Sequence, residues 1–383
     1  MTSSYADFQY EIYLANDRCD LPFNMSELEE RARRVISPQG YSYVASGAAT
    51  EETMQANAES FRRWRIVPRM LRDVSSRDLS VELFGTWFPA PVLLSPVGVQ
   101  SIVHPDGEVA SAKAAASLGI PFVLSSVASV NIEDVAVAMG DSPRWFQLYW
   151  PKDPELTRSF LGRAEDSGYS AIVVTLDNAL VGWRTRDLAL KYLPFLLGPM
   201  ANYFSDPVFR AGLAVPPEED LDAAILHFAA VFADMTLTWA DLAVLRKMTR
   251  LPLLVKGITH PDDARAAIDN GADGIVVSNH GGRQVDGAIA ALDALPDVIK
   301  AVAGQTPVLF DSGIRSGSDA FKALALGARA VLLGRPYLWG LALAGERGVR
   351  HVLRSFLADL DLTFALSGCS ALADCGANAL RRV

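Results

Sequence analysis

The sequence predicts an α/β protein built as a (β/α)8 TIM barrel, with a helical N-terminal segment and a long lid insertion after the fourth strand. Three observations support this prediction. Helical stretch, glycine and apolar run recur in the same order, eight apolar runs of strand length follow one another, and polar residues end each run. Parallel strands buried on both faces are continuously apolar, and eight of them joined by helices most economically close into a barrel. A doubly wound open sheet is the alternative.

The size and composition of the chain allow one large domain or two ordinary ones. Of its 383 residues, 50% are hydrophobic and 21% are charged, which is sufficient apolar material for a sizeable core. We expect residues 1–383 to form a single barrel domain, with a mostly helical lead-in over 1–88 and a lid insertion over 185–237.

The insertion is aromatic rather than polar. It contains the stretch YLPFLLGPMANYFSDPVF, whereas a solvated linker is rich in polar residues. Long insertions in compact domains are frequently lids or binding loops. We therefore expect a lid packed over the site, with a contact between subunits as the alternative.

Three segments, 150–177, 258–279 and 314–335, share one order of elements. In each, a start rich in Pro, Asp or Ser leads into an amphipathic stretch, which ends at a glycine before an apolar run. These are signals for a capped helix, a left-handed exit and a buried strand. The expected caps are Asp153, Asp262 and Ser318, and the expected exit glycines are Gly168, Gly271 and Gly327.

Eight apolar runs give the expected strands. They lie at 91–96, 121–126, 145–149, 171–176, 252–256, 274–278, 307–311 and 330–334. The catalytic face of such a barrel is formed by the loops after the strands. The residues at these ends are Ser95 to Gly98, Ser125 and Ser126, Gln147 to Tyr149, Thr175 to Asp177, Lys256, Ser278 to His280, Asp311 to Arg315, and Gly334 with Arg335.

Two glycine-rich turns follow the seventh and eighth strands. DSGIRSG and GRP each contain one arginine, and exposed backbone N–H groups beside a guanidinium suit a phosphate. This is also the usual phosphate position in (β/α)8 barrels. Taken alone, the pattern fits barrels that bind unrelated phosphates.

Charge and composition exclude several classes of partner. A net charge of −9 argues against nucleic acid, which requires a basic face. The uncharged stretch 192–205 is broken by Pro194, Gly198 and Pro199 and is too short to span a bilayer, so no membrane association is expected. Three cysteines and five histidines form no metal or disulfide pattern, and the N-terminus does not look like a secretory signal. We expect a cytoplasmic protein without a metal.

Several motifs together carry a family resemblance. SNHGGRQ, FQLYWP, VTLDNALVGWRTRDL, LLVKG, DSGIRSGSDAFKALALGA and GRP resemble the FMN-dependent L-2-hydroxy acid oxidase and dehydrogenase family, from about Tyr41 to Ser367. SNHGGRQ is the most specific of them, whereas DSGIR also occurs in other flavin and nucleotide barrels. Within the family, SPVGV, GWRTRDL and NYFSDPVF are most similar to lactate 2-monooxygenases, relatives of lactate oxidase.

The resemblance implies FMN as the cofactor. Its phosphate is expected in the loops of the last two strands, its ribityl chain at an aspartate, and its ring against the first strand and the lysine of the fifth. A fixed ammonium near N1 and the C2 carbonyl of a flavin raises its electron affinity. The implied cofactor residues are Pro96, Val97, Gly98, Ser125, Gln147, Thr175, Lys256, Ser278, Asp311, Gly313, Arg315, Gly334 and Arg335.

The resemblance also implies the residues that act on the substrate. His280 is expected to take a proton from the 2-hydroxy acid, with Asp177 orienting it, because an imidazole titrates near neutral pH. Arg184 and Arg283 are expected to clamp the substrate carboxylate, since a planar guanidinium bonds it at two points. Tyr43 is matched to the carboxylate and Tyr149 to the reacting oxygen.

Three other residues are expected to lie outside the chemistry. Arg186, close to the expected clamp, is expected to pair on the surface or with the lid. His104 and His260 each precede a proline at an expected helix start, where a structural role is favoured.

The sequence departs from the family pattern at three positions. Val127 stands where relatives acting on glycolate often carry tryptophan, and it could alter the pocket for the substrate side chain. Ser312 replaces the second glycine of a common DGG and is expected to be tolerated. Gly98 stands where relatives carry alanine, and it is expected to leave room beside the flavin.

These features predict oxidation of a short L-2-hydroxy acid, best L-lactate, with O2 as acceptor. Lactate 2-monooxygenase, which releases acetate and CO2, is the first expectation, followed by an oxidase that releases a 2-oxo acid and H2O2. A dehydrogenase using a quinone or cytochrome and a non-redox phosphate-binding barrel are the alternatives. The resemblance also implies a homo-oligomer, a tetramer or an octamer.

Overall fold

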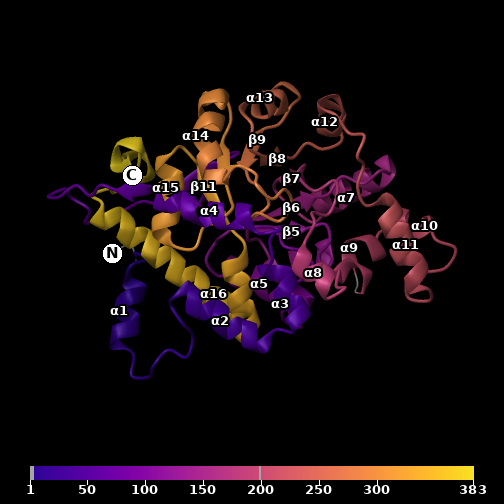
Figure 1. Ribbon diagram of the computed structural model, residues 1–383, viewed down its shortest axis with the longest axis horizontal. Helices are drawn as coiled ribbons and strands as arrows, with labels where there is room; N and C mark the ends of the chain where they lie inside the picture. Colours follow the sequence, from indigo (N-terminus) through magenta and orange to yellow (C-terminus); the bar gives the residue numbers. More distant parts are fainter. Residues whose placement is uncertain (1–3, 198–199) are drawn as a thin grey trace.

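The computed structural model describes residues 4–197 and 200–383. Eight parallel strands close into a barrel, in the order β10, β11, β4, β5, β6, β7, β8, β9 around the wall (Figure 1). The strands are β4 (Val92–Leu94), β5 (Phe122–Ser125), β6 (Arg144–Leu148), β7 (Ile172–Thr175), β8 (Leu253–Ile258), β9 (Gly274–Val277), β10 (Val308–Phe310) and β11 (Ala330–Leu333). Each predicted apolar run overlaps one of these strands, which confirms the barrel and excludes the open sheet.

Helices between the strands cover the outside of the barrel. They are α5 (Gly107–Ala116), α6 (Ile132–Met139), α7 (Pro154–Asp166), α12 (Trp239–Arg246), α13 (Pro261–Asp269), α14 (Ala291–Val302), α15 (Gly317–Ala325) and α16 (Arg335–Leu366), with the short 3-10 helix η1 (Gln100–Ile102) after β4. Helix α16 is two helices joined at a kink, where Ala344 and Gly345 leave helical geometry. Among the described residues, no helix has both the length and the apolar composition that a membrane span requires.

A β-hairpin closes the amino end of the barrel. It consists of β2 (Val81–Leu83) and β3 (Thr86–Phe88), and its apolar side chains share one buried cluster with those pointing into the barrel. The rings of Phe84 and Trp145 lie 5.9 Å apart at this end. Since apolar side chains fill the amino end, only the carboxyl end is free for a site.

The lead-in is helical in its first two thirds only. Its helices are α1 (Asp7–Leu14), α2 (Met25–Val35), α3 (Pro38–Ala45) and α4 (Glu52–Arg62), and β1 (Trp64–Ile66) follows. The expectation of a mostly helical segment to residue 88 is therefore wrong for its last third, because runs of three residues are too short to show a period in the sequence. β1 pairs with β12 (Leu380–Arg382). Two short 3-10 helices, η3 (Leu372–Asp374) and η4 (Ala377–Ala379), precede β12 in the chain.

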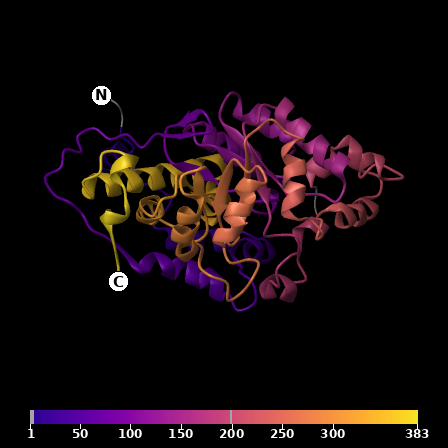
Figure 2. The ribbon, with the colours of Figure 1, turned by 90° about the horizontal axis from the view of Figure 1, so that it is seen from above.

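The insertion forms a lobe of short helices beside the barrel. They are α8 (Thr185–Ala189), η2 (Pro194–Leu196), α9 (Ala201–Phe204), α10 (Pro207–Ala211) and α11 (Leu221–Val231), and Figures 1 and 2 show most of this lobe on the side away from the two termini. Asn202 anchors it, because its side chain donates to the carbonyls of Ser125 and Ser126 at 3.1 and 3.2 Å. Gly198 and Pro199, expected to interrupt this stretch, lie outside the described residues.

The three expected exit glycines are confirmed, but two of the expected caps are not. Gly168, Gly271 and Gly327 all have positive φ, and Asp153 caps α7. Helix α13 is capped instead by His260 and α15 by Ser316. In both cases the helix begins earlier than expected, so Asp262 and Ser318 lie inside the first turn.

Candidate active site

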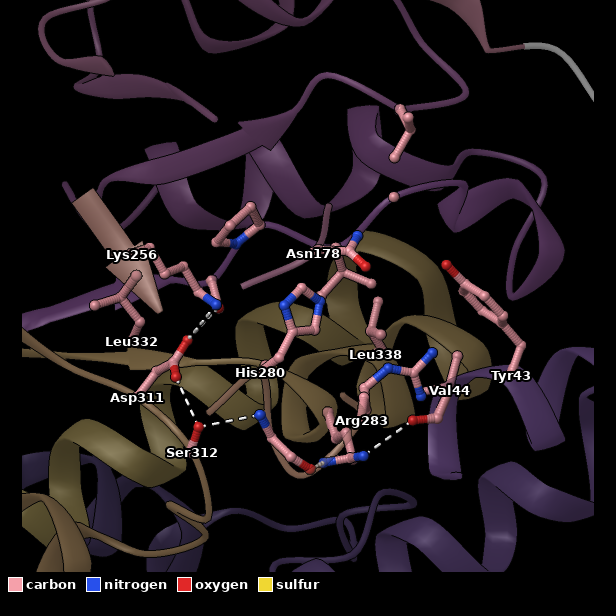
Figure 3. A pocket seen from close by; sticks show the side chains of 18 of the residues that line it. Tyr43, Val44, Asn178, Lys256, His280, Arg283, Asp311, Ser312, Leu332 and Leu338 are labelled. Carbon is pink, nitrogen blue, oxygen red and sulfur yellow. Dashed lines mark hydrogen bonds and ion pairs between the residues drawn. The ribbon is translucent and has the colours of Figure 1, made fainter. Parts of the chain in front are cut away.

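A cavity of about 950 Å³, open to solvent, lies at the carboxyl end of the barrel. Figure 3 shows His280 between Lys256 and Asp311 on one side and Arg283 with Tyr43 on the other. The predicted site residues that line it are Tyr43, Pro96, Val97, Gly98, Tyr149, Arg184, Lys256, His280, Arg283, Asp311, Gly313, Arg315, Gly334 and Arg335. Residues from both ends of the chain thus converge on one hollow.

His280 and Asp177 form the pair that the sequence predicts. His280 Nδ1 lies 2.8 Å from Asp177 Oδ1, which leaves Nε2 as the ring nitrogen free to accept a proton. Burial lowers the pKa of His280 and Lys256 lowers it further, while Asp177 partly opposes them. Burial acts to raise the pKa of Asp177, but the charges of His280 and Lys256 outweigh it and the pKa is lowered. Asp177 is therefore a carboxylate that holds an imidazole.

Lys256 lies at the other end of the cavity in a connected polar cluster. Its Nζ donates to Ser278 Oγ at 3.0 Å and lies 3.3 Å from Asp311 Oδ2. Ser312 Oγ donates to Asp311 Oδ1 at 2.8 Å and accepts from the Gly281 N–H at 3.0 Å. Burial acts to lower the pKa of Lys256, but Asp311 and Asp177 raise it above its ordinary value. Lys256 is thus a fixed ammonium.

Arg184 and Arg283 lie together beside Tyr43. Arg184 is 5% exposed, and its Nε donates to the Arg283 carbonyl at 3.3 Å. The Arg283 guanidinium donates to the Ser46 carbonyl at 2.8 Å and lies 5.0 Å from the centre of the Tyr43 ring. Burial and the neighbouring Arg184 lower the pKa of Arg283 to about 10. The two cations thus share a confined space that favours an anion.

Arg315 and Arg335 form a second cationic group. Arg335 donates to the carbonyls of Val44, Gly281 and Ser46 at 2.9, 3.1 and 2.9 Å, whereas the Arg315 guanidinium donates to the Ile314 carbonyl at 2.9 Å. Burial lowers the pKa of both, and for Arg335 the charges of Arg283 and Arg315 add to the effect. Four arginines line the cavity: Arg184, Arg283, Arg315 and Arg335. None of them forms an ion pair with a carboxylate of residues 4–197 and 200–383.

Tyr149 presents a neutral phenol to the cavity. Burial and the neighbouring Tyr43 raise its pKa to about 12, so its hydroxyl keeps its proton at neutral pH and remains available as a donor. Its ring packs 5.2 Å from that of Phe232 in the insertion.

Four predicted cofactor residues lie behind the cavity wall. Gln147 accepts from Ser125 Oγ and donates to Thr175 Oγ1, both at 3.0 Å. Ser278 Oγ accepts from Lys256 and from the His280 N–H. These residues are among the described ones that do not line the cavity, so their side chains bond one another in this structure.

The residues present fit FMN. A phosphate requires donors and positive charge, and the unpaired Arg315 guanidinium supplies both beside Gly313 and Gly334. A ribityl chain requires an acceptor such as Asp311, and a flavin ring requires a flat surface such as Pro96 to Gly98. Lys256 provides the positive charge that favours a reduced flavin. We therefore assign the end of the cavity with Lys256, Asp311 and Arg315 to the cofactor.

The cavity has lining residues beyond the predicted set. Val127, Val181 and Phe195 line it with apolar atoms, and Asn178 and Ser312 line it with polar atoms. The sequence singles out Val127 and Ser312 as departures from the family pattern, and it predicts an effect of Val127 on the pocket for the substrate side chain. Phe195 comes from the insertion, where its aromatic composition was the available signal, but no pattern distinguishes it from the other aromatic residues there.

The expectation for Gly98 is wrong. A Cβ atom on Gly98 would lie 2.6 Å from Val127 Cγ2 and 2.9 Å from the Val127 carbonyl oxygen. The glycine therefore allows a close approach of two loops and leaves no open space. Two of the three departures from the family pattern, Gly98 and Val127, thus form one contact.

The three residues expected outside the chemistry behave as predicted. Arg186 pairs with Glu51 at the surface. His104 Nδ1 and His260 Nδ1 accept from backbone N–H groups two residues further on, at 3.2 and 3.1 Å. Both histidines serve the starts of helices.

Comparison with known proteins finds a matching family and similar individual proteins. The model of the family described as FMN-dependent dehydrogenase matches residues 32–382. An L-lactate oxidase of Lysinibacillus sphaericus is 42% identical over 365 residues, 94% of each chain, and the FMN-dependent alpha-hydroxy acid dehydrogenase qulF of Penicillium citrinum is 45% identical over 94% of this chain and 90% of its own. Among solved structures, a Pediococcus acidilactici lactate oxidase matches with a TM-score of 0.86 and 36% identity over 96% of both chains.

Proposed function

Because the chain belongs to the FMN-dependent dehydrogenase family, we propose that it oxidises a short L-2-hydroxy acid, L-lactate in the first place, with O2 as acceptor. That it is an FMN-dependent 2-hydroxy acid oxidoreductase follows from the family. The substrate and the acceptor are the proposal. L-lactate oxidases at 42% and 44% identity support both.

One observation carries the proposal. A histidine held by a largely buried carboxylate, at 2.8 Å, shares a cavity with Arg184 and Arg283, which pair with no carboxylate of the described chain. A base beside an unfilled carboxylate clamp suits a substrate with a hydroxyl next to a carboxylate. A phosphate-binding barrel without redox chemistry would not require this arrangement.

Each residue then has a definite task. Arg283 and Arg184 bind the substrate carboxylate, and Tyr149 donates a hydrogen bond to the reacting oxygen. His280 Nε2 accepts the hydroxyl proton, and Asp177 stabilises the imidazolium that results. FMN, bound at the Lys256 end, would supply the acceptor for the α-hydrogen and the two electrons of its bond to the α-carbon.

The apolar wall supports a small apolar side chain on the substrate. Val127, Val181 and Phe195 line the same cavity as the clamp, and the Phe195 ring lies 5.9 Å from that of Tyr43. A methyl group suits this wall better than the hydrogen of glycolate, because it gains apolar contact.

A direct test is the colour of the purified protein. We expect a yellow protein that bleaches with L-lactate without O2 and recovers its colour in air. A panel of 2-hydroxy acids, from glycolate to mandelate, ranks the side chains by kcat/KM. A colourless protein, or one whose colour no 2-hydroxy acid bleaches, would contradict the proposal.

The fate of the products separates two versions of the reaction. We favour release of pyruvate and H2O2, because two relatives at 42% and 44% identity are L-lactate oxidases. The monooxygenase outcome, acetate and CO2, is supported by the motif resemblance and by the insertion, whose Phe195 lines the cavity, since a closed insertion retains the products. Turnover with excess catalase distinguishes them, because acetate then forms only if pyruvate and peroxide react before release.

A further inference from the structure

Helix α4 of the lead-in lies directly against the loop that carries His280 and Arg283. Gly282 has a φ of +76°, and a Cβ atom there would lie 2.5 Å from the Met54 nitrogen. At Gly313, in the next loop, a Cβ atom would lie 2.9 Å from the Asn57 carbonyl oxygen. Helix backbone and loop backbone therefore touch, with no side chain between them.

The loop supplies the cap of this helix. Glu51 stands at the N-cap position and its side chain makes no capping bond. Instead, the Asp286 carboxylate accepts from the N–H groups of Thr50 and Thr53 at 2.8 and 3.2 Å. Free N–H groups at a helix start require such an acceptor. Here it comes from a residue more than 230 positions away, three after Arg283.

A pair of amides fixes the other end of the loop. Asn57 Nδ2 donates to Asn279 Oδ1, and Asn279 Nδ2 donates to Asn57 Oδ1, both at 2.8 Å. Asn279 Oδ1 also accepts from the Gly282 N–H at 3.1 Å, which closes a turn around His280. Asn57 is 1% exposed, so water cannot replace its amide without a rearrangement.

His280 requires such support. It has a φ of +58°, a left-handed conformation that a residue with a side chain adopts only when its surroundings enforce it. We infer that Asn57 and Asp286 are positioning residues of the active site, through which α4 holds the His280–Arg283 loop in its productive geometry. This inference rests on the proposed function of His280 and Arg283.

The inference predicts a catalytic defect in a folded, FMN-loaded enzyme. In Asn57→Ala and Asp286→Ala we expect kcat/KM for L-lactate to fall by about 10²-fold, the effect of a displacement of about 1 Å in an active site. The acid limb of the pH profile should move, because the His280–Asp177 distance changes. Asp286→Asn keeps an acceptor oxygen and should recover part of the loss.

A matched variant separates positioning from general stability. Asn24 caps α2 by accepting from Ser26 N and Glu27 N at 2.9 and 3.2 Å, and α2 belongs to the same lead-in. We expect Asn24→Ala to lower Tm but to leave kcat, KM and the pH profile unchanged. If Asn57→Ala and Asp286→Ala behave like Asn24→Ala, the inference is overturned.

Oxalate binding gives a readout independent of turnover. Oxalate, a small dicarboxylate, should perturb the FMN absorbance when the arginine clamp holds it, and its Kd should rise at least about tenfold in both variants. If the wild type oxidises no 2-hydroxy acid but the variants still bind oxalate more weakly than it does, the proposed function fails and the positioning role stands. If the wild type is active but both variants bind oxalate as tightly as it does, the positioning role alone is refuted. Should Asn57→Ala not fold, the two Asp286 variants decide.

Discussion

Arg283 is a largely buried cation whose guanidinium donates to the Ser46 carbonyl and faces the Tyr43 ring. Its charge is not neutralised by any carboxylate of the described chain, and burial with Arg184 lowers its pKa to about 10. A largely buried arginine without a carboxylate partner favours a bound anion, since the anion supplies the missing opposite charge. The substrate carboxylate meets that requirement.

Arg283→Met should therefore weaken substrate binding and leave FMN in place. A hydrogen bond to a charged group contributes about 1.5–3 kcal/mol, so two of them correspond to about 10²-fold or more in kcat/KM. Steady-state kinetics and the FMN content of the purified variant measure the two effects. Arg186→Met is the matched control, because Arg186 pairs with Glu51 outside the cavity. Unchanged KM and kcat in Arg283→Met would refute the clamp.

The protonation state of His280 determines the pH dependence of kcat/KM that we expect. It must be neutral to accept a proton, so kcat/KM should fall as the pH drops through its pKa. Burial and Lys256 lower that pKa from 6.5, which places the midpoint of the acid limb below 6.5. Asp177 opposes this shift, so Asp177→Asn should move the midpoint to still lower pH and reduce the maximal rate by about 10²-fold or more. A midpoint that moves upward in Asp177→Asn would show that another group controls the limb.

Strand β8 brings the lysine and the carboxylate of the site together through an irregularity. Its pairing with β9 shifts register between Lys256 and Ile258, and Gly257 between them has a φ of +107°. A Cβ atom on Gly257 would lie 2.6 Å from Asp177 Cβ. The bulge thus lets β7 and β8 approach each other where their ends supply Asp177 and Lys256.

Gly257→Ala should act on the chemistry by displacing Asp177. The positive φ alone costs about 1–3 kcal/mol, and the contact with Asp177 adds a local shift. We expect a lower Tm, a lower kcat and an acid limb displaced in the same direction as in Asp177→Asn. Gly304→Ala isolates the cost of the backbone, because Gly304 has a φ of +75° and open space around it. If the pH profile of Gly257→Ala is identical to that of the wild type, the substitution does not displace Asp177 and the prediction is wrong.

The sequence predicts elements better than the contacts between them. Eight apolar runs and the polar residues that end them follow from local composition, so the barrel and most of the cavity lining were predictable. The packing of α4 against the His280 loop was not, because Asn57 and Asp286 find partners more than 220 residues away. The row Ser125, Gln147, Thr175 could be placed at strand ends, but its internal hydrogen bonds could not, because they join side chains of neighbouring strands.

At the scale of the whole molecule, a chain of negative net charge carries a cationic site. The net charge is −9, yet four arginines and Lys256 face one cavity, where one carboxylate, Asp311, lines the wall. Lead-in, barrel and C-terminus are tied together around this site, since β1 pairs with β12 and Arg335 bonds the lead-in carbonyls of Val44 and Ser46. Cofactor binding and global stability should therefore be coupled.

Removal of FMN should lower Tm, and inorganic phosphate should restore part of it. Without an anion, Arg315 and Arg335 remain charged and confined, and burial together with their mutual repulsion lowers the pKa of Arg335. A ligand that binds only the folded state at 100 times its Kd adds about 2.7 kcal/mol of stability. Thermal unfolding of the apo-protein at increasing phosphate concentrations, with chloride at equal ionic strength as the control, measures this effect.

Arg315→Gln should reduce the rise of Tm with phosphate, because the Arg315 guanidinium donates to the Ile314 carbonyl and has no carboxylate partner in the described chain. An equal rise of Tm in Arg315→Gln and in the wild type would place the phosphate site elsewhere.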